Sequence, residues 1–324
     1  MEEKGRIGIP NALMFYRYFA LWRCFFEELG WKVMVSGGLG KKGKIIYFED
    51  SCLPMKLLVT HAMFLKDKVD HLFIPRLVSL HRTYIMCPKF RGAPDIVRLA
   101  TEGNVSIIDE TIDLRIKGNS LLQSFSKIGE KLGTSKKESK QAFLKAQQSF
   151  STFQKEWVDR INQLPSRQLF EIDIPTPVPH KISPPMKVAL IGHPYNLFDI
   201  DINKDIITLI KGLGMEILTS DHLSGEEIDR QISDLSKEIY WSSGREIVGS
   251  LLHFLSGGVD GVVFLTSFKC GIDALLQEFI KRRLKVQGGA SIPFLTLSFD
   301  EHTGREGLTT RLEAFRDVME ARKH

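Results

Sequence analysis

Short hydrophobic runs alternate with longer amphipathic stretches along the first part of the chain. The short runs have the length and composition of β-strands, and they are RIGIP (6–10), KVMVS (32–36), IIYF (45–48), HLFIP (71–75), TYIM (83–86) and VSIID (105–109). Between about Ala12 and Gly30 the apolar positions have the period of an amphipathic helix. Strands that alternate with helices in this way predict a parallel β-sheet covered by helices.

The pattern changes in the middle of the chain. From about Asn119 to Leu164 the sequence predicts long charged helices. The next segment, IPTPVPHKISPP (174–185), contains five prolines in twelve residues. We interpret it as a linker, because proline has no backbone N–H for a strand ladder and cannot continue a helix.

The alternation resumes after the proline-rich segment, with predicted strands at KVALIG (187–192), MEILTS (215–220), GVVFLTSF (261–268) and IPFLTLSF (292–299). The two halves open on similar strand exits, RIGIPN (6–11) and ALIGHPYN (189–196), although such exits favour Gly, Pro and Asn in any protein. We therefore predict two doubly wound α/β domains with parallel sheets. The first, residues 1–173, includes the long connecting helices, and the linker 174–185 joins it to residues 186–324.

The composition is that of an ordinary soluble globular protein, with 43% hydrophobic and 26% charged residues. The net charge of +5 is spread without a basic stripe, so we expect no nucleic-acid partner. No apolar run approaches the roughly 20 residues that span a bilayer. The acidic start, MEEKGRIGIPN, has no signal-peptide core. We expect a cytoplasmic protein that does not bind membranes.

Three of the four cysteines follow predicted strands. Cys52 follows IIYFEDS, Cys87 follows TYIM, and Cys270 follows GVVFLTSFK. In an open α/β sheet the carboxyl edge of the strands is where ligands bind. The positive end of a following helix dipole also favours the thiolate form of such a cysteine. Cys24 differs, because it lies inside the helical stretch FALWRCFFEEL and is interpreted as a small buried hydrophobic residue.

The cysteine positions alone leave three interpretations open. Free cysteines are commonly buried, and the chain has no C-x-x-C spacing, so the thiols could be inert. Three thiolates from two domains would suit an iron–sulfur cluster with one open iron. They would also suit a zinc site that a histidine completes. Disulfides are the least expected state for distant cysteines in a reducing compartment.

Five stretches of the chain resemble a known protein family. They are IGIPNALMFYRYFALWRCFFEELGWKV, SCLPMKLLVTHAMFL, HLFIPRLVSL, MCPKFRGAPDIVR and PFLTLSFDEHTGREGLTTRLEAF. In these stretches the sequence is similar to the acyl-CoA dehydratase activase-related proteins. Those proteins belong to the superfamily of 2-hydroxyacyl-CoA dehydratase and benzoyl-CoA reductase subunits. The resemblance covers nearly the whole chain except the charged helices and the linker.

The resemblance implies two flavodoxin-like domains that face each other across a cleft. It also implies a [4Fe–4S] cluster held by three cysteines at strand ends, and Cys52, Cys87 and Cys270 match those positions. In that superfamily the cluster receives a low-potential electron from a separate ATP-hydrolysing activase and passes it to an acyl-CoA. The implied partners are therefore an ATP-dependent activase or reductase, an acyl-CoA substrate, and a related subunit in a homo- or heterodimer.

The chain departs from this family in two ways. It contains no ATP-binding motif, since GGLGKKGK (37–44) lacks the residue order of a phosphate-binding loop. Its four cysteines are too few for the double-cubane relatives. Two alternatives to a dehydratase or reductase component therefore stay open: a non-catalytic electron relay or scaffold subunit, and a metal-free α/β binding protein.

The segment DEHTGREG (300–307) follows the last predicted strand and is a further candidate. Glu301 and His302, with Asp300 beside them, would lie near the same sheet edge as Cys270. We predict that Glu301 and His302 carry protons there or bind the outer shell of the cluster. The alternative is an ordinary polar helix N-terminus, where acidic residues are favoured by the dipole.

Five other polar residues lie near strand ends. Asn11 and His193 occupy equivalent exits of the two halves and could line the site, although turn formation explains both. Arg76, Lys89 and Arg91 could bind CoA phosphates or the activase. Solvated surface charge is the simpler interpretation of Lys89 and Arg91.

Overall fold

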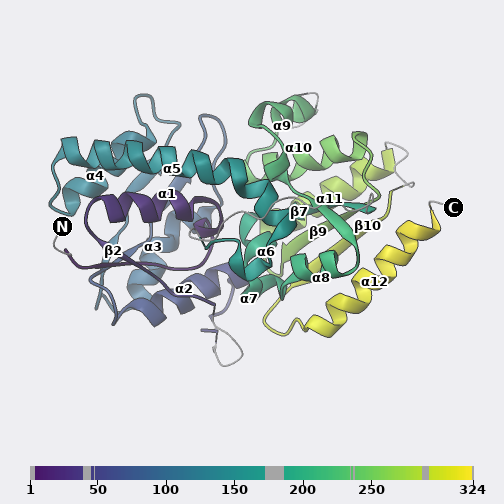
Figure 1. Ribbon diagram of the computed structural model, residues 1–324, viewed down its shortest axis with the longest axis horizontal. Helices are drawn as coiled ribbons and strands as arrows, with labels where there is room; N and C mark the ends of the chain where they lie inside the picture. The colour runs from purple at the N-terminus through teal and green to yellow at the C-terminus, as the bar shows by residue number, and fades with distance from the viewer. Residues whose placement is uncertain are drawn as a thin grey trace. The chain divides into compact units, whose positions relative to one another are not determined.

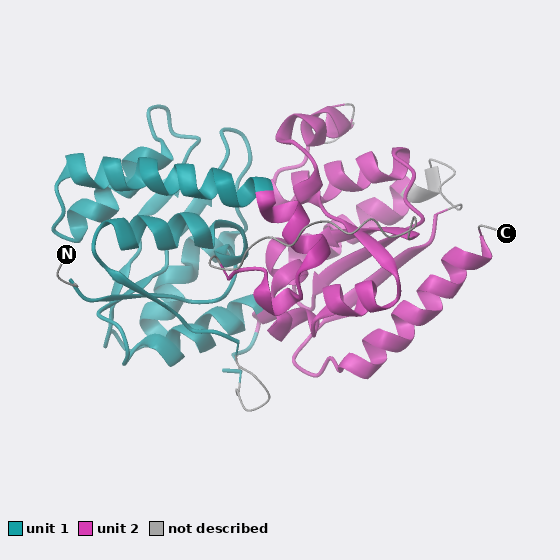
Figure 2. Ribbon diagram, in the orientation of Figure 1, with its two compact units in different colours: residues 1–49, 54–155 teal, residues 50–53, 156–324 magenta. Residues whose placement is uncertain are grey.

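The computed structural model describes residues 4–38, 45–46, 48–171, 186–233, 235, 238–286 and 292–322. The chain forms two compact units, shown in different colours in Figure 2. Unit 1 comprises residues 1–49 and 54–155, and unit 2 comprises residues 50–53 and 156–324. The predicted linker, 174–185, lies outside the described residues. The domain boundaries drawn from the sequence therefore stay a prediction.

Unit 1 is built on a four-stranded parallel sheet with the strand order β2-β1-β3-β5. Its strands are β1 (Arg6–Ile9), β2 (Lys32–Val35), β3 (His71–Phe73) and β5 (Ser106–Ile108), and the helices between them are α1 (Phe15–Glu28), α2 (Leu53–Leu65) and α3 (Pro88–Ala100). A separate parallel pair consists of β4 (Arg76–Ser79) and β6 (Thr111–Asp113). The prediction of a parallel sheet with intervening helices is confirmed.

The core of unit 1 is apolar and largely aromatic. Ile7 and Ile9 of β1 are fully buried, as expected for a strand in the middle of a sheet with both faces covered. Against this sheet, α1 packs Trp22 and Phe26, whose rings lie 5.2 Å and 5.0 Å from the ring of Phe73 at edge-to-face angles. Such pairs add to the free energy of simple burial, so β3 and α1 are fixed to each other.

The charged middle of the chain forms two helices, as predicted: α4 (Leu121–Lys131) and the 28-residue α5 (Lys136–Gln163). Ser120 caps α4 by accepting a hydrogen bond from the backbone N–H of Gln123. Ser135 and Glu138 bond reciprocally at the start of α5 in the manner of a capping box. The short 3₁₀ helix η1 (Ser166–Gln168) follows.

Unit 2 contains a second four-stranded parallel sheet, with the strand order β10-β9-β7-β8. Its elements are β7 (Met186–Gly192), α6 (Pro194–Phe198), α7 (Ile200–Asn203), α8 (Ile206–Gly212), β8 (Met215–Leu218), η2 (Ser220–His222), α9 (Gly225–Ile232), α10 (Ser242–Ser256), β9 (Gly261–Ser267), α11 (Gly271–Val286), β10 (Phe294–Phe299) and α12 (Arg305–Ala321). Helices α8 and α12 contact each other, as do α10 and α11, and the two pairs lie on opposite faces of the sheet (Figure 1).

The two sheets have the same topology. In each, the second strand lies beside the first on one side, and the third and fourth strands follow on the other side. This is the strand order of flavodoxin-like doubly wound sheets, in which the order of the strands reverses between the first and the third strand. The similar strand exits RIGIPN and ALIGHPYN therefore belong to equivalent positions, and the prediction of two doubly wound sheets is confirmed.

Two predicted strands are wrong among the described residues. In TYIM (83–86) only Ile85 forms an isolated bridge, and residues 45, 46 and 48 of IIYF form no strand. Pro88, Gly92 and Pro94, which as proline and glycine favour a break, lie within helix α3. Pro88 is tolerated since the first helical residue needs no backbone N–H. Most of the stretch 37–44 lies outside the described residues.

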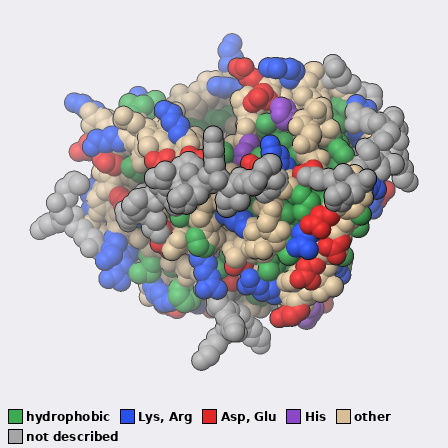
Figure 3. All heavy atoms as spheres, turned by 45° about the vertical axis from the view of Figure 1, so that its right-hand side comes forward, with side chains coloured by type: hydrophobic (Ala, Val, Ile, Leu, Met, Phe, Trp, Pro, Cys, Tyr) green, Lys and Arg blue, Asp and Glu red, His purple; other side chains and the backbone are tan. Residues whose placement is uncertain are grey.

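Two surface properties can be compared with the sequence predictions. On the face shown in Figure 3, basic and acidic side chains are interspersed rather than segregated. Within the described parts of the chain, none of the helices combines the length and the hydrophobicity needed to cross a membrane.

Candidate functional site

The centre of the unit 2 sheet carries a cluster of polar residues at the carboxyl ends of β7 and β9. His193 directly follows β7 and precedes α6, and Asn196 lies in α6. Ser267 ends β9, and Cys270 directly precedes α11, which contains Asp273 in its first turn. These are the first and third strands of the unit, so the cluster occupies the position where doubly wound sheets bind ligands.

Asp273 is the centre of this cluster and is only 1% exposed. One carboxylate oxygen, Oδ2, accepts a hydrogen bond of 2.9 Å from Thr266 Oγ1 and longer ones of 3.4 Å from Ser267 N and Asn196 Nδ2. Ser267 Oγ in turn donates to Asn196 Oδ1 at 2.7 Å. Because the donors come from β9 and α6, both strand exits hold the carboxylate in place.

The other carboxylate oxygen of Asp273, Oδ1, lies 2.7 Å from His193 Nε2 in a buried ion pair. Burial disfavours the charged form of His193, but the charge and close approach of Asp273, together with the nearby Cys270, outweigh it and raise the pKa of His193 well above its ordinary value. Burial likewise opposes ionisation of Asp273, yet the neighbouring His193 and the donors Thr266 and Ser267 lower the pKa of the carboxyl group. Both partners are therefore held in their charged forms.

Cys270 completes the cluster with a half-buried thiol. One donor atom each of His193, Cys270 and Asp273 lies within 4.8 Å of the other two. The ring of Tyr195 stacks on His193 with a centroid separation of 4.8 Å and an interplanar angle of 10°. The nitrogen, sulfur and oxygen atoms of this arrangement could hold a single metal ion. Alternatively, the imidazole could support the cysteine sulfur by hydrogen bonding.

The three predicted ligand cysteines share one local environment. Each of them is the residue directly before the first residue of a helix: Cys52 before α2, Cys87 before α3 and Cys270 before α11. The first backbone N–H groups of a helix have no partner within it and, with the dipole, favour negative charge nearby. Cys24 lies inside α1, as predicted, but it is half-buried rather than buried, and partial burial raises the pKa of its thiol.

The cysteines are distributed over both units. The structure groups residues 50–53, and with them Cys52, in unit 2 together with Cys270, whereas Cys87 lies in unit 1. Cys52 is buried, and Cys87 and Cys270 are half-buried. The convergence of the three sulfur atoms on one cluster stays a prediction.

The segment predicted to carry protons forms a turn between β10 and α12. Asp300 Oδ1 accepts hydrogen bonds from His302 N at 3.0 Å and Thr303 Oγ1 at 2.8 Å, and Thr303 Oγ1 also accepts from Asp300 N. Burial opposes ionisation of Asp300, but these bonds outweigh it and lower the pKa of the carboxyl group. Since β10 pairs with β9, the turn lies at the sheet edge that also carries Cys270. The roles of Glu301 and His302 stay predictions.

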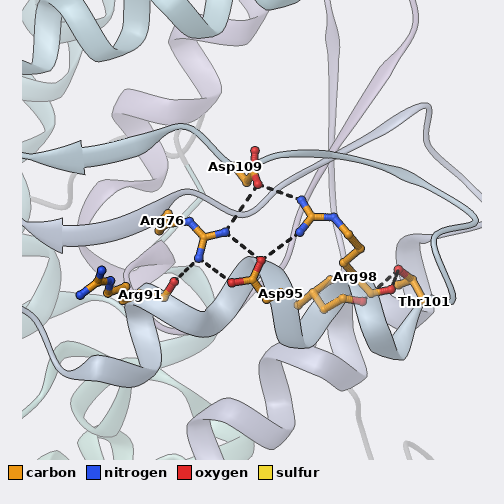
Figure 4. Close-up of polar contacts among 7 residues, drawn as sticks. Arg76, Arg91, Asp95, Arg98, Thr101 and Asp109 are labelled. Carbon is orange, nitrogen blue, oxygen red and sulfur yellow. Dashed lines mark hydrogen bonds and ion pairs between the residues drawn. The ribbon is translucent and has the colours of Figure 1, made fainter.

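Arg76, at the start of β4, is part of an ion-pair network in unit 1 (Figure 4). Its guanidinium donates to both carboxylate oxygens of Asp95 at 2.6 and 2.8 Å and to the carbonyl of Arg91 at 2.6 Å. Asp109 lies 3.7 Å away, and Arg98 bridges Asp95 and Asp109 from the far side. The hydrogen bond from Arg76 lowers the pKa of Asp95. Arg76 therefore braces α3, whose first turn follows Cys87, rather than offering a free guanidinium to a phosphate.

Sequence reasoning missed the central role of two residues. Asp273 in the first turn of a helix and Asn196 after a strand both have simple local explanations, as a dipole partner and a turn residue. The available signal was the pairing of strand exits, since ALIGHPYN follows a first strand and TSFKCGID follows a third strand. The pattern of residues along the chain does not reveal the strand order, and only the strand order shows that these two exits are neighbours.

The family model of the CoA enzyme activase uncharacterised domain matches residues 6–223, which is more than half of the chain. Cys52, Cys87 and His193 lie within the matched residues, and Cys270 and Asp273 follow them. No curated protein matches the sequence.

Proposed function

Because the chain belongs to the CoA enzyme activase uncharacterised domain family, we propose that it is an iron–sulfur component of an acyl-CoA dehydratase or reductase system. In this proposal Cys52, Cys87 and Cys270 hold a [4Fe–4S] cluster. A separate ATP-dependent activase supplies the cluster with low-potential electrons, and an acyl-CoA is the final acceptor. The relation to 2-hydroxyacyl-CoA dehydratase and benzoyl-CoA reductase subunits is part of the same proposal.

The observation that carries the proposal is the shared position of the three cysteines. Iron–sulfur clusters are held by cysteine thiolates, and their potentials respond to charge and to hydrogen bonds at the sulfur atoms. A sulfur at a helix N-terminus lies near the positive end of the helix dipole. Cys52, Cys87 and Cys270 all have this position, and the fourth cysteine, Cys24, does not. This shared position supports the proposal.

The other residues of the site would serve the cluster and its substrate. When bound, the cluster supplies one-electron transfer. Cys87 and Cys270 are half-buried, and in this proposal a donor or a substrate would approach the cluster from their side. Glu301 and His302, in the turn after β10, are the proposed proton carriers. A related subunit in a homo- or heterodimer is part of the proposal.

Anaerobic purification and reconstitution with iron and sulfide test the cluster. The wild-type protein should bind one cluster, measured as iron and acid-labile sulfide, and should give an EPR signal after reduction. Cys52→Ser, Cys87→Ser and Cys270→Ser should each lower the bound iron. Cys24→Ser is the matched control, and it should keep the iron of the wild type. Equal iron in all four variants, or zinc in place of iron, would overturn the assignment.

Turnover separates a catalytic component from an electron relay. The reconstituted protein is mixed with an activase, ATP, a strong reductant and an acyl-CoA, and the acyl product is quantified. Product formation that depends on the three cysteines supports a dehydratase or reductase component. ATP-dependent reduction of the cluster without any acyl product would instead support the relay function.

A further inference from the structure

The side chain of His193 is more deeply buried and more restrained by its neighbours than a turn residue needs to be. Its side chain is almost completely buried, although it lies at the exit of β7 where the chain turns into α6. Two groups restrain the imidazole: the Asp273 carboxylate at 2.7 Å and the stacked ring of Tyr195 at 4.8 Å. A buried ring with these neighbours has little freedom to rotate.

Asp273 is restrained in turn by residues from two strand exits. Thr266 and Ser267 at the end of β9 and Asn196 in α6 donate hydrogen bonds to Oδ2, which leaves Oδ1 for His193. The carboxylate thus fixes the imidazole, and a ring nitrogen of His193 lies within 4.8 Å of the Cys270 sulfur. The sheet thus positions Asp273, Asp273 positions His193, and His193 lies beside the sulfur of Cys270.

We propose that His193, oriented by Asp273, is a positioning residue for Cys270 and donates a hydrogen bond to its sulfur when that sulfur is a cluster ligand. This role rests on the proposed function. An imidazole has two ring nitrogens, so it can serve the carboxylate and the sulfur together. Outer partners of this kind orient metal ligands and tune the metal they hold.

The hydrogen bond has a predictable effect on the cluster. Reduction adds negative charge to the cluster and its sulfur ligands, and an N–H donor stabilises that charge. His193 therefore raises the reduction potential of the cluster. Asp273 alone, without the imidazole, would place an uncompensated negative charge near the sulfur and lower the potential.

The test compares four anaerobically reconstituted full-length variants with the wild type: His193→Leu, His193→Gln, Asp273→Asn and the control His222→Gln. His222 is a half-buried histidine that follows the neighbouring strand β8, and its ring accepts a hydrogen bond from the backbone N–H of Thr219. The cluster potential is measured by EPR-monitored redox titration, and the Fe–S(Cys) stretching modes are measured by resonance Raman spectroscopy. Circular dichroism and iron content show whether each variant folds and loads.

We expect the potential of His193→Leu to be more negative than that of the wild type, with shifted Fe–S(Cys) modes. The glutamine side chain keeps an amide donor, so His193→Gln should give a smaller shift and act as the conservative rescue. The potential of Asp273→Asn should fall between those of the two His193 variants, and the potential of His222→Gln should match that of the wild type.

Three outcomes would overturn the role. A loaded His193→Leu protein with the potential and Raman modes of the wild type overturns it while leaving the cluster in place. Equal shifts in His193→Leu and His222→Gln show a general effect of removing a histidine. A wild-type protein that takes up no iron overturns the proposed function and this role with it. If His193→Leu does not fold, the comparison of His193→Gln with His222→Gln decides.

Discussion

Acidification should destabilise unit 1 through one buried histidine in α2. His61 is completely buried, and neither of its ring nitrogens has a hydrogen-bond partner among the described residues. Burial lowers the pKa of His61 from 6.5 to about 4. The folded unit therefore keeps a neutral ring where the unfolded chain already binds a proton.

The sign follows from proton linkage. Because the unfolded state binds the extra proton, the free energy of unfolding is at its full value above pH 6.5 and falls as the pH drops from there toward 4. A pKa difference of one unit corresponds to about 1.4 kcal/mol. The loss at pH 5 is therefore about 2 kcal/mol, and it reaches about 3 kcal/mol below pH 4.

Hydrogen exchange of the α2 peptides measures this loss within unit 1, without assuming that the whole chain unfolds in one step. Protection factors, corrected for the intrinsic pH dependence of exchange, are compared at pH 7.5 and 5.0 for the wild type and His61→Leu. The wild type should lose about 30-fold more protection than the variant, the equivalent of about 2 kcal/mol. The variant should also be more protected at pH 7.5, because it removes an unpaired buried polar group.

His302→Gln controls for the removal of a titrating histidine, since His302 is exposed in a turn. It should keep the full pH dependence of the wild type. An identical loss of protection in the wild type and in His61→Leu would refute the reasoning, because the pH dependence would then come from other groups.

Burial lowers the pKa of Lys211 to about 8, so the protection of unit 2 should rise between pH 8 and 10 in the wild type and stay flatter in Lys211→Met. Gly249→Ala should destabilise unit 2 by about 1–3 kcal/mol, because its Cβ would lie 2.8 Å from a backbone oxygen of α9. Gly212→Ala, with open space around it, should be neutral or stabilising in thermal unfolding. Arg76→Lys should weaken the bidentate contact with Asp95 and raise exchange in α3 by the equivalent of about 1 kcal/mol or less.

The sheets could be predicted because their central strands are buried on both faces. A strand such as β9, buried along its whole length, contains the apolar run VVFL, which readily predicts a strand. The short strands β4 and β6 carry polar residues and were missed, whereas the apolar run TYIM forms no strand. Over three or four residues, tertiary pairing decides the outcome and composition does not.

The site was predictable only where local sequence determines it. The helix starts after Cys52 and Cys270 follow from the local sequence pattern, whereas the strands predicted before Cys52 and Cys87 are not formed among the described residues. The ion pair of His193 with Asp273 joins residues 80 positions apart and depends on β7 lying next to β9. No local signal carries that information.

The grouping of residues 50–53 with unit 2 has a consequence for synthesis on the ribosome. These four residues belong to unit 2, the residues from 54 to 155 belong to unit 1, and every residue after Lys155 belongs to unit 2. The ribosome therefore synthesises Cys52 long before the rest of unit 2. Cys52 can pack with its unit only after the carboxyl-terminal half of the chain has been made. Neither unit is one continuous stretch of the gene, so no single truncation can encode either of them whole.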